Sequence, residues 1–377
     1  MIKSFKIRLL PNKEQEELML KSIGCSRFAY NWALNICNEN YKNGIKYNMT
    51  NIRKEFTQLK KQDEYKWLNE VSKTTMVESM RNLDKAFKQF FKTKKGYPKF
   101  KTKRKSRLSF YVRYDRLYFI NNFANIEKIG KVKYKTNYNI PQGKNVCKFR
   151  NPYCSYDGKY WYLSFGFEVE ENQTTLNKDL SIGIDLGIKD LAICSNGMIF
   201  KNINKTKRVK RLKKRLKRLQ RQVSKKYEAN KQGNKFIKTN NIIKLEERIK
   251  LVHRKLSNIR NNHIHQATNK IIKLKPYRVV MEDLNVSGMM KNKHLSKAIQ
   301  EQCFYEFIRQ MKYKCEFNGI EFVQADRFYP SSKTCSCCGN IKKDLKLKDR
   351  VYKCDNCGLE IDRDKNASIN ISRYGLV

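Results

Sequence analysis

Five acidic residues stand at positions where a carboxylate is unfavourable without a partner. Asp185 interrupts the apolar strand-like run SIGIDLG, Glu282 and Asp283 end the run RVVMEDL, and Asp362 and Asp364 precede a helix start in EIDRDKNAS. Removing a carboxylate from water costs free energy that an arginine or a divalent cation offsets. Taken singly, each case also fits a strand-end salt bridge or a helix N-cap.

Taken together, the acidic positions predict a metal site. If the strand around Asp185, the strand at 277–284 and the final helix are neighbours, as in an RNase H-like sheet, their carboxylates converge. Such a cluster repels itself without cations, and hard oxygen ligands suit Mg²⁺ or Mn²⁺. Two ions about 4 Å apart would activate a water and stabilise the leaving oxygen in phosphodiester hydrolysis.

Four cysteines have the spacing of a second metal site. Cys335 and Cys338, then Cys354 and Cys357, form two C-x2-C pairs separated by fifteen residues. This spacing predicts one structural zinc ion in a closed four-thiolate site, which leaves no open position for chemistry. Cys337 stays an alternative to Cys338, although C-x-C would give a strained bite. We expect the other seven cysteines to be small core residues: Cys25, Cys37, Cys147, Cys154, Cys194, Cys303 and Cys315.

A strongly basic segment follows the first acidic position. Between Lys201 and Arg221 there are twelve basic residues and no acidic one. Apolar residues recur there at steps of three and four, and the pattern returns between 245 and 259, which predicts a helical hairpin over 205–265. A purely solvated coiled coil is the alternative. The absence of acidic residues favours nucleic-acid contact, with these candidates: Lys210, Arg211, Lys214 and Arg218.

The remaining patterns predict the elements around these sites. Residues 3–10 alternate like a strand, residues 12–95 are helical in character, and short strand-like runs follow from 96. The first strand has no partner among the helices, so we expect it to join the later strands in a small barrel or curled sheet. Residues 171–180 read as a linker, and a strand, one helix at 296–318 and another strand at 320–328 follow the hairpin.

The composition restricts the partner. The 377 residues contain 82 Lys and Arg against 35 Asp and Glu, a net charge of +47 that only a polyanion neutralises. The length argues against a short ribosomal or histone-like packing protein. No apolar stretch approaches the ~18 residues that a membrane span needs, and the amino terminus lacks a signal-peptide core. We therefore expect a cytoplasmic, nucleoid-associated protein without a membrane partner.

With these residues in view, the sequence resembles the TnpB family of transposon-encoded RNA-guided nucleases, which are similar to ancestors of type V CRISPR effectors. The specific motifs are GIDLGIKDLA, VVMEDLNVSGM, FYPSSKTCSCCG and CGLEIDRDKNASINI, in that order. Weaker matches are GCSRFAYNWAL, LDKAFKQFF and GYPKFKTK. The family's split nuclease motifs carry over as Asp185, Glu282 and Asp364; Asp364 is chosen over Asp362 because it stands two residues before Asn366. Ser368 departs from the family, which often has Ala there.

The resemblance implies an α+β multidomain fold. Residues 1–11 and 96–178 would form an OB-like β-barrel wedge domain, interrupted by a helical recognition domain over 12–95. Residues 181–377 would form an RNase H-like (RuvC) nuclease domain with the basic hairpin at 205–265 and a zinc ribbon at 330–360. The partners would be a guide RNA from the transposon end and double-stranded DNA next to a short motif, in a 1:1 ribonucleoprotein with a monomer.

The alternatives are a catalytically silent RNA-guided repressor, which predicts loss of an acidic residue, and a transposase or accessory protein that joins strands. None of the three acidic residues is missing. The recognition helices add further candidates for nucleic-acid contact: Lys73, Thr74, Thr75, Glu78, Lys85, Lys88 and Lys92.

Overall fold

The structure is a computed structural model that describes residues 1–103, 105–170, 175–346 and 349–375. It divides into two compact units, Met1–Glu170 and Glu171–Val377, and each is described here by itself. Within the described residues, no helix is both long enough and apolar enough to cross a membrane.

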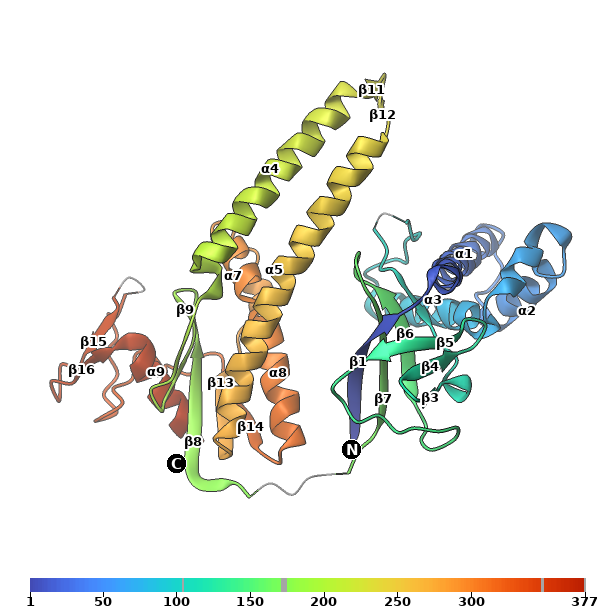
Figure 1. The fold of residues 1–377 in the computed structure, drawn as a ribbon. Coiled ribbons are helices and arrows are strands. Elements are labelled where there is room, and N and C mark those ends of the chain that lie inside the picture. The colour runs from blue at the N-terminus through green and yellow to red at the C-terminus, as the bar shows by residue number, and fades with distance from the viewer. Residues whose placement is uncertain (104, 171–174, 347–348, 376–377) are drawn as a thin grey trace. The chain divides into compact units, whose positions relative to one another are not determined.

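Seven antiparallel strands of the first unit form one sheet in the order β2-β6-β7-β1-β5-β4-β3 (Figure 1). Their bounds are β1 (Ile2–Leu10), β2 (Ser109–Tyr111), β3 (Tyr118–Ile120), β4 (Phe123–Ile126), β5 (Gly130–Lys135), β6 (Arg150–Tyr156) and β7 (Trp161–Glu168). β1 pairs with β5 and β7, so the amino-terminal strand joins the strands that follow the helices, as expected. In the described residues the edge strands β2 and β3 do not pair, so the small barrel or curled sheet expected from the sequence is a half-barrel.

Helices occupy the insertion between β1 and β2. They are α1 (Lys13–Lys42), α2 (Met49–Leu59), the 3-10 helix η1 (Asp63–Glu70) and α3 (Lys73–Thr93). Asn12 begins α1 with a reciprocal capping box to Gln15. The apolar stripe of α3 is core: Met80, Leu83 and Phe87 are buried against residues of α1 and α2. A short 3-10 turn, η2 (Tyr114–Arg116), follows β2.

The second unit contains a five-stranded sheet in the order β10-β9-β8-β13-β14. The strands are β8 (Asn177–Leu186), β9 (Asp190–Cys194), β10 (Ile199–Lys201), β13 (Pro276–Glu282) and β14 (Glu321–Ala325). β13 runs parallel to both β8 and β14, whereas β8, β9 and β10 are antiparallel. β8 begins inside the stretch expected to be a linker, because Asn177 already pairs with Pro276.

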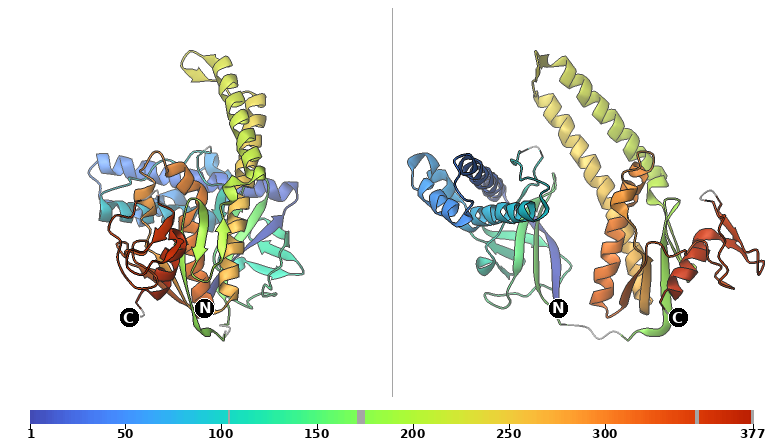
Figure 2. Two further views of the ribbon diagram at one scale, coloured as in Figure 1. Left: turned by 90° about the vertical axis from the view of Figure 1, so that its left-hand side faces the viewer. Right: turned by 180° about the vertical axis from the view of Figure 1, so that it is seen from behind.

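The helical hairpin consists of α4 (Lys207–Ala229) and α5 (Asn240–Lys273), which project together from the sheet (Figures 1 and 2). Two short strands, β11 (Lys231–Gln232) and β12 (Lys235–Phe236), join them. The apolar residues predicted at steps of three and four pack between the helices, with Val209, Leu219, Val252 and Leu256 buried. The carboxyl half of α5 packs instead against the sheet, where Ile264 and Ile271 contribute to its core.

The remaining elements of this unit are η3 (Ile203–Lys205), α6 (Val286–Met289), α7 (Ser296–Gln302), α8 (Phe304–Phe317), β15 (Val351–Lys353), β16 (Glu360–Asp362) and α9 (Arg363–Arg373). The single helix expected at 296–318 is wrong. Cys303 adopts φ +56°, a left-handed conformation that ends α7 and begins α8. A helix cannot continue through such a residue.

Candidate active site and metal centre

The sheet brings two of the acidic residues side by side. β13 pairs in parallel with β8, with Met281 opposite Ile184. The next residue of each strand is therefore Glu282 beside Asp185, on the same face of the sheet because paired residues point to the same side. β13 ends at Glu282, so these carboxylates lie at the carboxyl edge of the parallel strands.

Helix α9 brings the third. Asp364 lies in the first turn of α9, which packs against β8 at Gly183. A Cβ on Gly183 would lie 2.1 Å from the carbonyl oxygen of Ser368 and 2.3 Å from the amide nitrogen of Ser372. This contact requires glycine, because no side chain fits between the strand and the helix backbone.

The electrostatics of Asp185 reflect this arrangement. The pKa of Asp185 is raised to about 8. Burial of the carboxyl group is the largest cause, followed by the nearby carboxylates of Glu282 and Asp364. Arg363 opposes the shift only in part. A desolvated carboxyl among like charges has the donor chemistry that a hard divalent cation stabilises, so these residues fit Mg²⁺ or Mn²⁺.

The two other acidic residues have local partners. Asp283 forms an ion pair with Arg327 at 2.6 Å, which is the strand-end salt bridge weighed from the sequence. Asp362 is the N-cap of α9 and accepts hydrogen bonds from the backbone amides of Asp364 and Lys365. Among the described residues, Asp364 has a long contact of 3.8 Å with the exposed Arg350. Local pairing therefore accounts for Asp283 and Asp362, whereas the arginines that act on the trio are Arg350 at this distance and Arg363, which only partly opposes the raised pKa of Asp185.

The four cysteines form the tighter cluster. The sulfur atoms of Cys335, Cys338, Cys354 and Cys357 all lie within 4.8 Å of one another, and two pairs are 3.6 Å apart. A tetrahedron with metal–sulfur bonds of about 2.3 Å has edges of about 3.8 Å, so the cluster can hold a zinc ion. In the part of the chain that the structure describes, the three carboxylates are not drawn together as tightly as these sulfurs.

The backbone of the cluster supports the same reading. Gly339 and Gly358 adopt φ +76° and φ +71°, the left-handed turns expected after each C-x2-C pair. Their amides donate to the carbonyl oxygens of Cys335 and Cys354. Cys337 is exposed and lies outside the cluster, so Cys338 is the fourth sulfur.

Polar residues that the sequence did not single out join the cysteine cluster to the acidic site. The Ser331 hydroxyl donates to the Glu282 carboxylate. Asn366, which is fully buried in α9, accepts from the amide of Ser336 and donates to the carbonyl of Thr334. Asn370 donates to the carbonyls of Ser331 and Thr334. Displacement of the cysteine segment would therefore displace both Glu282 and α9.

The nucleic-acid candidates of the first unit differ in their surroundings. Thr75 is 1% exposed and donates to the carbonyl of Tyr111, so its hydroxyl is not available at the surface. Glu78 pairs with Arg81 and Lys85, and Lys88 pairs with Asp84 at 2.9 Å. Three others lie exposed or partly exposed on α3: Lys73, Thr74 and Lys92.

The candidates on the hairpin lie together. Arg211, Lys214 and Arg218 line a hollow of about 630 Å³ along α4, whose other lining residues are basic or glutamine. Lys210 is exposed one residue before this group. A hollow lined by cations, with no carboxylate in its lining, suits a phosphate backbone.

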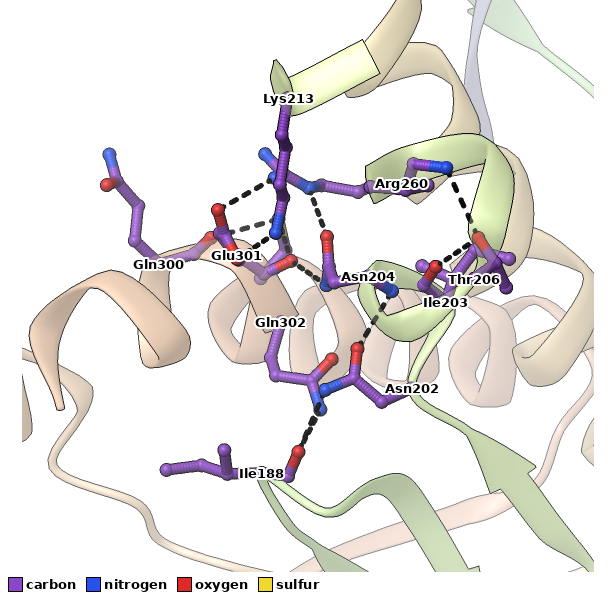
Figure 3. A network of polar contacts seen from close by, with 12 residues as sticks. Ile188, Asn202, Ile203, Asn204, Thr206, Lys213, Arg260, Gln300, Glu301 and Gln302 are labelled. Atoms are coloured by element: carbon purple, nitrogen blue, oxygen red, sulfur yellow. Dashed lines mark hydrogen bonds and ion pairs between the residues drawn. The ribbon is translucent and has the colours of Figure 1, made fainter. Parts of the chain in front are cut away.

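A polar network forms the base of the hairpin (Figure 3). Glu301 pairs with Lys213 of α4 at 2.5 Å and with Arg260 of α5 at 3.5 Å. The Arg260 guanidinium also donates to the side chain of Asn204, whose amide donates to the carbonyl of Glu301. The network therefore joins both hairpin helices to α7.

Three family models match the chain: "Helix-turn-helix domain" over residues 1–46, "Probable transposase" over 164–293 and "Cas12f1-like, TNB domain" over 304–371. In the structure, residues 1–46 contain β1 and α1. The three models together reach from the first strand to the last helix.

Similar proteins span nearly the whole chain. A protein of Streptomyces pristinaespiralis named "Putative RNA-guided DNA endonuclease" is 30% identical over 99% of this chain and 89% of its own length. The protein named "Putative RNA-guided DNA endonuclease InsQ" of Escherichia coli (strain K12) is 29% identical over 99% of this chain and 92% of its own length. A CRISPR-associated endodeoxyribonuclease, Cas12f1 of Sulfoacidibacillus thermotolerans, is 28% identical over 56% of this chain and 50% of its own length.

The fold has a solved counterpart. The protein in a cryo-EM structure of a Cas12f1-sgRNA-target DNA complex covers 99% of this chain with 98% of its own, at a TM-score of 0.54 and 16% sequence identity. This similarity concerns the α+β fold with its half-barrel sheet. The relative that is 30% identical over nearly the whole of both chains shows that this chain belongs to the TnpB family of RNA-guided DNA endonucleases.

Proposed function

We propose that this protein is an RNA-guided DNA endonuclease that hydrolyses double-stranded DNA next to a short motif. Relatives that align over nearly its whole length are named RNA-guided DNA endonucleases. The observation that carries the proposal is geometric: Glu282 lies beside Asp185 on paired strands, and Asp364 lies on the helix that packs against β8. The partners would be a guide RNA and the DNA target, in a complex of one chain with one RNA.

Each residue of the trio has a part in holding divalent ions. Asp185 supplies a carboxylate from β8, the central strand of the five-stranded sheet. Glu282 supplies a second carboxylate, which the Ser331 hydroxyl orients. Asp364 supplies the third from the first turn of α9, whose N-cap is Asp362. Two Mg²⁺ or Mn²⁺ ions bound there would activate the attacking water and stabilise charge on the leaving oxygen. The four cysteines would hold one zinc ion with a structural role.

The basic hairpin would contact the nucleic acid. Its cations, among them Arg211, Lys214 and Arg218, line a hollow along α4 to which no acidic residue contributes. Lysine and arginine on such a surface neutralise phosphates and release counterions, so binding would weaken with salt. Base pairing between the guide and the target would supply the sequence specificity.

The test compares isosteric variants in one assay. Asp185→Asn, Glu282→Gln and Asp364→Asn are purified with co-expressed RNA, which is sequenced, and cleavage is measured with Mg²⁺ on a library with randomised flanking DNA. We expect each variant to lose cutting while RNA binding stays near that of the unaltered protein. The matched control is Asp283→Asn, which removes only the exposed pair with Arg327 and should still cut.

Other outcomes assign other functions. Retained cutting in the trio variants would refute the assignment of the site. An unaltered protein that binds RNA and target DNA but never cuts would be a silent RNA-guided repressor. Joined strands in place of broken ends would identify a transposase.

A further inference from the structure

An aromatic pocket lies in the first unit. It has a volume of about 690 Å³, within the ~300–1,000 Å³ typical of small-ligand sites. Four rings line it, two from α1, one from η1 and one from the segment after α3: Phe28, Trp32, Trp67 and Phe100. We call these four residues the aromatic pocket.

The rings are held in place before any ligand binds. Phe28 contacts Trp67 edge to face with centroids 5.4 Å apart, and Trp32 contacts the buried Phe56 at 5.1 Å. Phe100 is fixed through its neighbour, because Asn31 of α1 both donates to and accepts from the backbone of Lys101 at 2.8 and 2.7 Å. Nevertheless Trp67 is 42% exposed and Phe100 is 52% exposed. Ordered aromatic rings at the surface are typical of recognition sites.

The charge around the aromatic pocket is positive. Lys21 and Glu70 neutralise each other at 2.6 Å, which leaves the guanidinium of Arg27 at the rim. In the described part of the chain, no carboxylate lies within ion-pair distance of Arg27. The same side chain borders a hollow of about 120 Å³, which Lys101 and Arg107 also line and to which no acidic residue contributes. Aromatic faces next to an unpaired guanidinium complement a base next to its phosphate.

We propose that the aromatic pocket binds an unpaired base of the guide RNA, with Arg27 on the adjoining phosphate. The inference rests on the RNA-binding role proposed above and adds a subsite to it. Stacking on rings tolerates any base, because every base has a π-face. RNA is the occupant rather than DNA because relatives of this chain are named RNA-guided.

The test measures RNA binding and not DNA cleavage. A negative result would therefore count against the aromatic pocket and not against the proposed nuclease activity. The probe is an unstructured single-stranded RNA with one 2-aminopurine, titrated with the full chain in 0.3 M NaCl; a DNA of the same sequence is the second probe. The variants are Phe100→Leu and Trp67→Leu, which keep apolar bulk without the ring. Phe123→Leu is the matched control, since Phe123 is a 38% exposed phenylalanine of β4 outside the aromatic pocket.

We expect Phe100→Leu and Trp67→Leu each to raise the Kd for the RNA on the order of tenfold and to reduce 2-aminopurine quenching. In both variants the dependence of RNA affinity on salt concentration should be unchanged. Arg27→Gln should reduce the slope of log affinity against log salt concentration by about 0.7, the value for one phosphate of a single strand. Phe123→Leu should bind as the unaltered chain does. Circular dichroism confirms that each variant is folded.

Three results would overturn the proposal. Equal Kd values for Phe100→Leu, Trp67→Leu and Phe123→Leu would exclude stacking in the aromatic pocket. A loss for the DNA probe with unchanged RNA binding would exclude RNA as the occupant. A dimer in sedimentation that Phe100→Leu dissociates would make the pocket a contact between two copies of the chain.

Discussion

The side-chain amide of Gln302 donates to the backbone carbonyl of Gly187 at 2.9 Å and also contacts the carbonyl of Ile188 at 3.2 Å. Gly187 lies two residues after Asp185, in the turn between β8 and β9. Gln302 is also the last residue of α7 and follows Glu301, which pairs with both hairpin helices. A continuous chain of contacts therefore runs from the base of the basic hairpin to the turn that carries the candidate catalytic strand.

The first prediction tests that chain of contacts. Gln302→Leu leaves the carbonyl of Gly187 without its side-chain donor, whereas the carbonyl of Ile188 still accepts from Asn202. An unsatisfied buried polar group costs about 1–3 kcal/mol. We expect a lower free energy of unfolding, measured by urea denaturation, and slower DNA cutting at saturating Mg²⁺, while RNA affinity is unchanged. The control is Gln300→Leu, because Gln300 is an exposed glutamine of the same helix. A cutting rate equal in the two variants would contradict the role of Gln302.

The second prediction concerns zinc. Because Ser331, Asn366 and Asn370 join the cysteine segment to Glu282 and α9, loss of the ion should disturb the acidic site. Cys354→Ser is expected to contain less than one zinc per chain by atomic emission, to melt at a lower temperature and to cut poorly. Cys337→Ser is the control, since Cys337 lies outside the cluster. A variant with full zinc content after Cys354→Ser would show that the cluster is not the metal site.

The sequence indicated the candidate site residues better than it indicated the residues that contact them. Asp185 could be found because a carboxylate inside an apolar run is unusual, and the cysteine spacing is visible without any fold. The partner of Asp283 could not be found, since Arg327 is 44 residues away and the contact exists only once β13 and β14 are parallel neighbours. Ser331 gave no signal either, because a serine beside a turn is ordinary until the fold places it against Glu282.

The helices and strands also divide into those that local sequence patterns predict and those that depend on tertiary structure. The hairpin could be predicted because its apolar steps are local. The break at Cys303 could not, since the helical pattern continues across it. The bonds of the preceding Gln302 to the β8–β9 turn depend on tertiary structure. Strand patterns indicate which segments are strands but not whether β2 and β3 meet, so they could not decide whether the barrel closes.

The third prediction concerns the contact between β8 and α9. Gly183→Ala places a methyl group against backbone atoms of α9 at 2.1 and 2.3 Å, so the helix that carries Asp364 must move. We expect a loss of about 1–3 kcal/mol in the free energy of unfolding, as for other overpacked sites, and a large loss of cutting. Gly24→Ala is the control: nothing lies within 4 Å of its added Cβ, and alanine favours the helix. Both are measured by urea denaturation, and Gly183→Ala is also measured by the cleavage assay; Gly24 lines the aromatic pocket, so its variant is a control for stability alone.

The fourth prediction concerns pH and Lys314, a buried lysine of α8. Its ammonium donates to Thr268 and Asn269 of α5 at 2.6 and 2.7 Å, and burial lowers its pKa from 10.5 to about 8, with Glu306 opposing the shift. Between about pH 8 and pH 10.5 the unfolded chain therefore holds the proton that the folded chain has released. The free energy of unfolding rises with pH across this window wherever the unfolded state binds more protons.

The neighbouring titratable groups do not supply this rise. Burial and then Lys314 lower the pKa of His265, so it is neutral throughout the window, and Glu306 stays ionised beside Arg309. Lys314→Met should therefore remove a pH-dependent gain of up to roughly 3 kcal/mol, measured as the difference between the two proteins in urea unfolding at pH 7.5 and pH 10. Lys312→Met, an exposed lysine of the same helix, should retain the gain. If all three proteins change equally with pH, Lys314 keeps its ordinary pKa in the folded state.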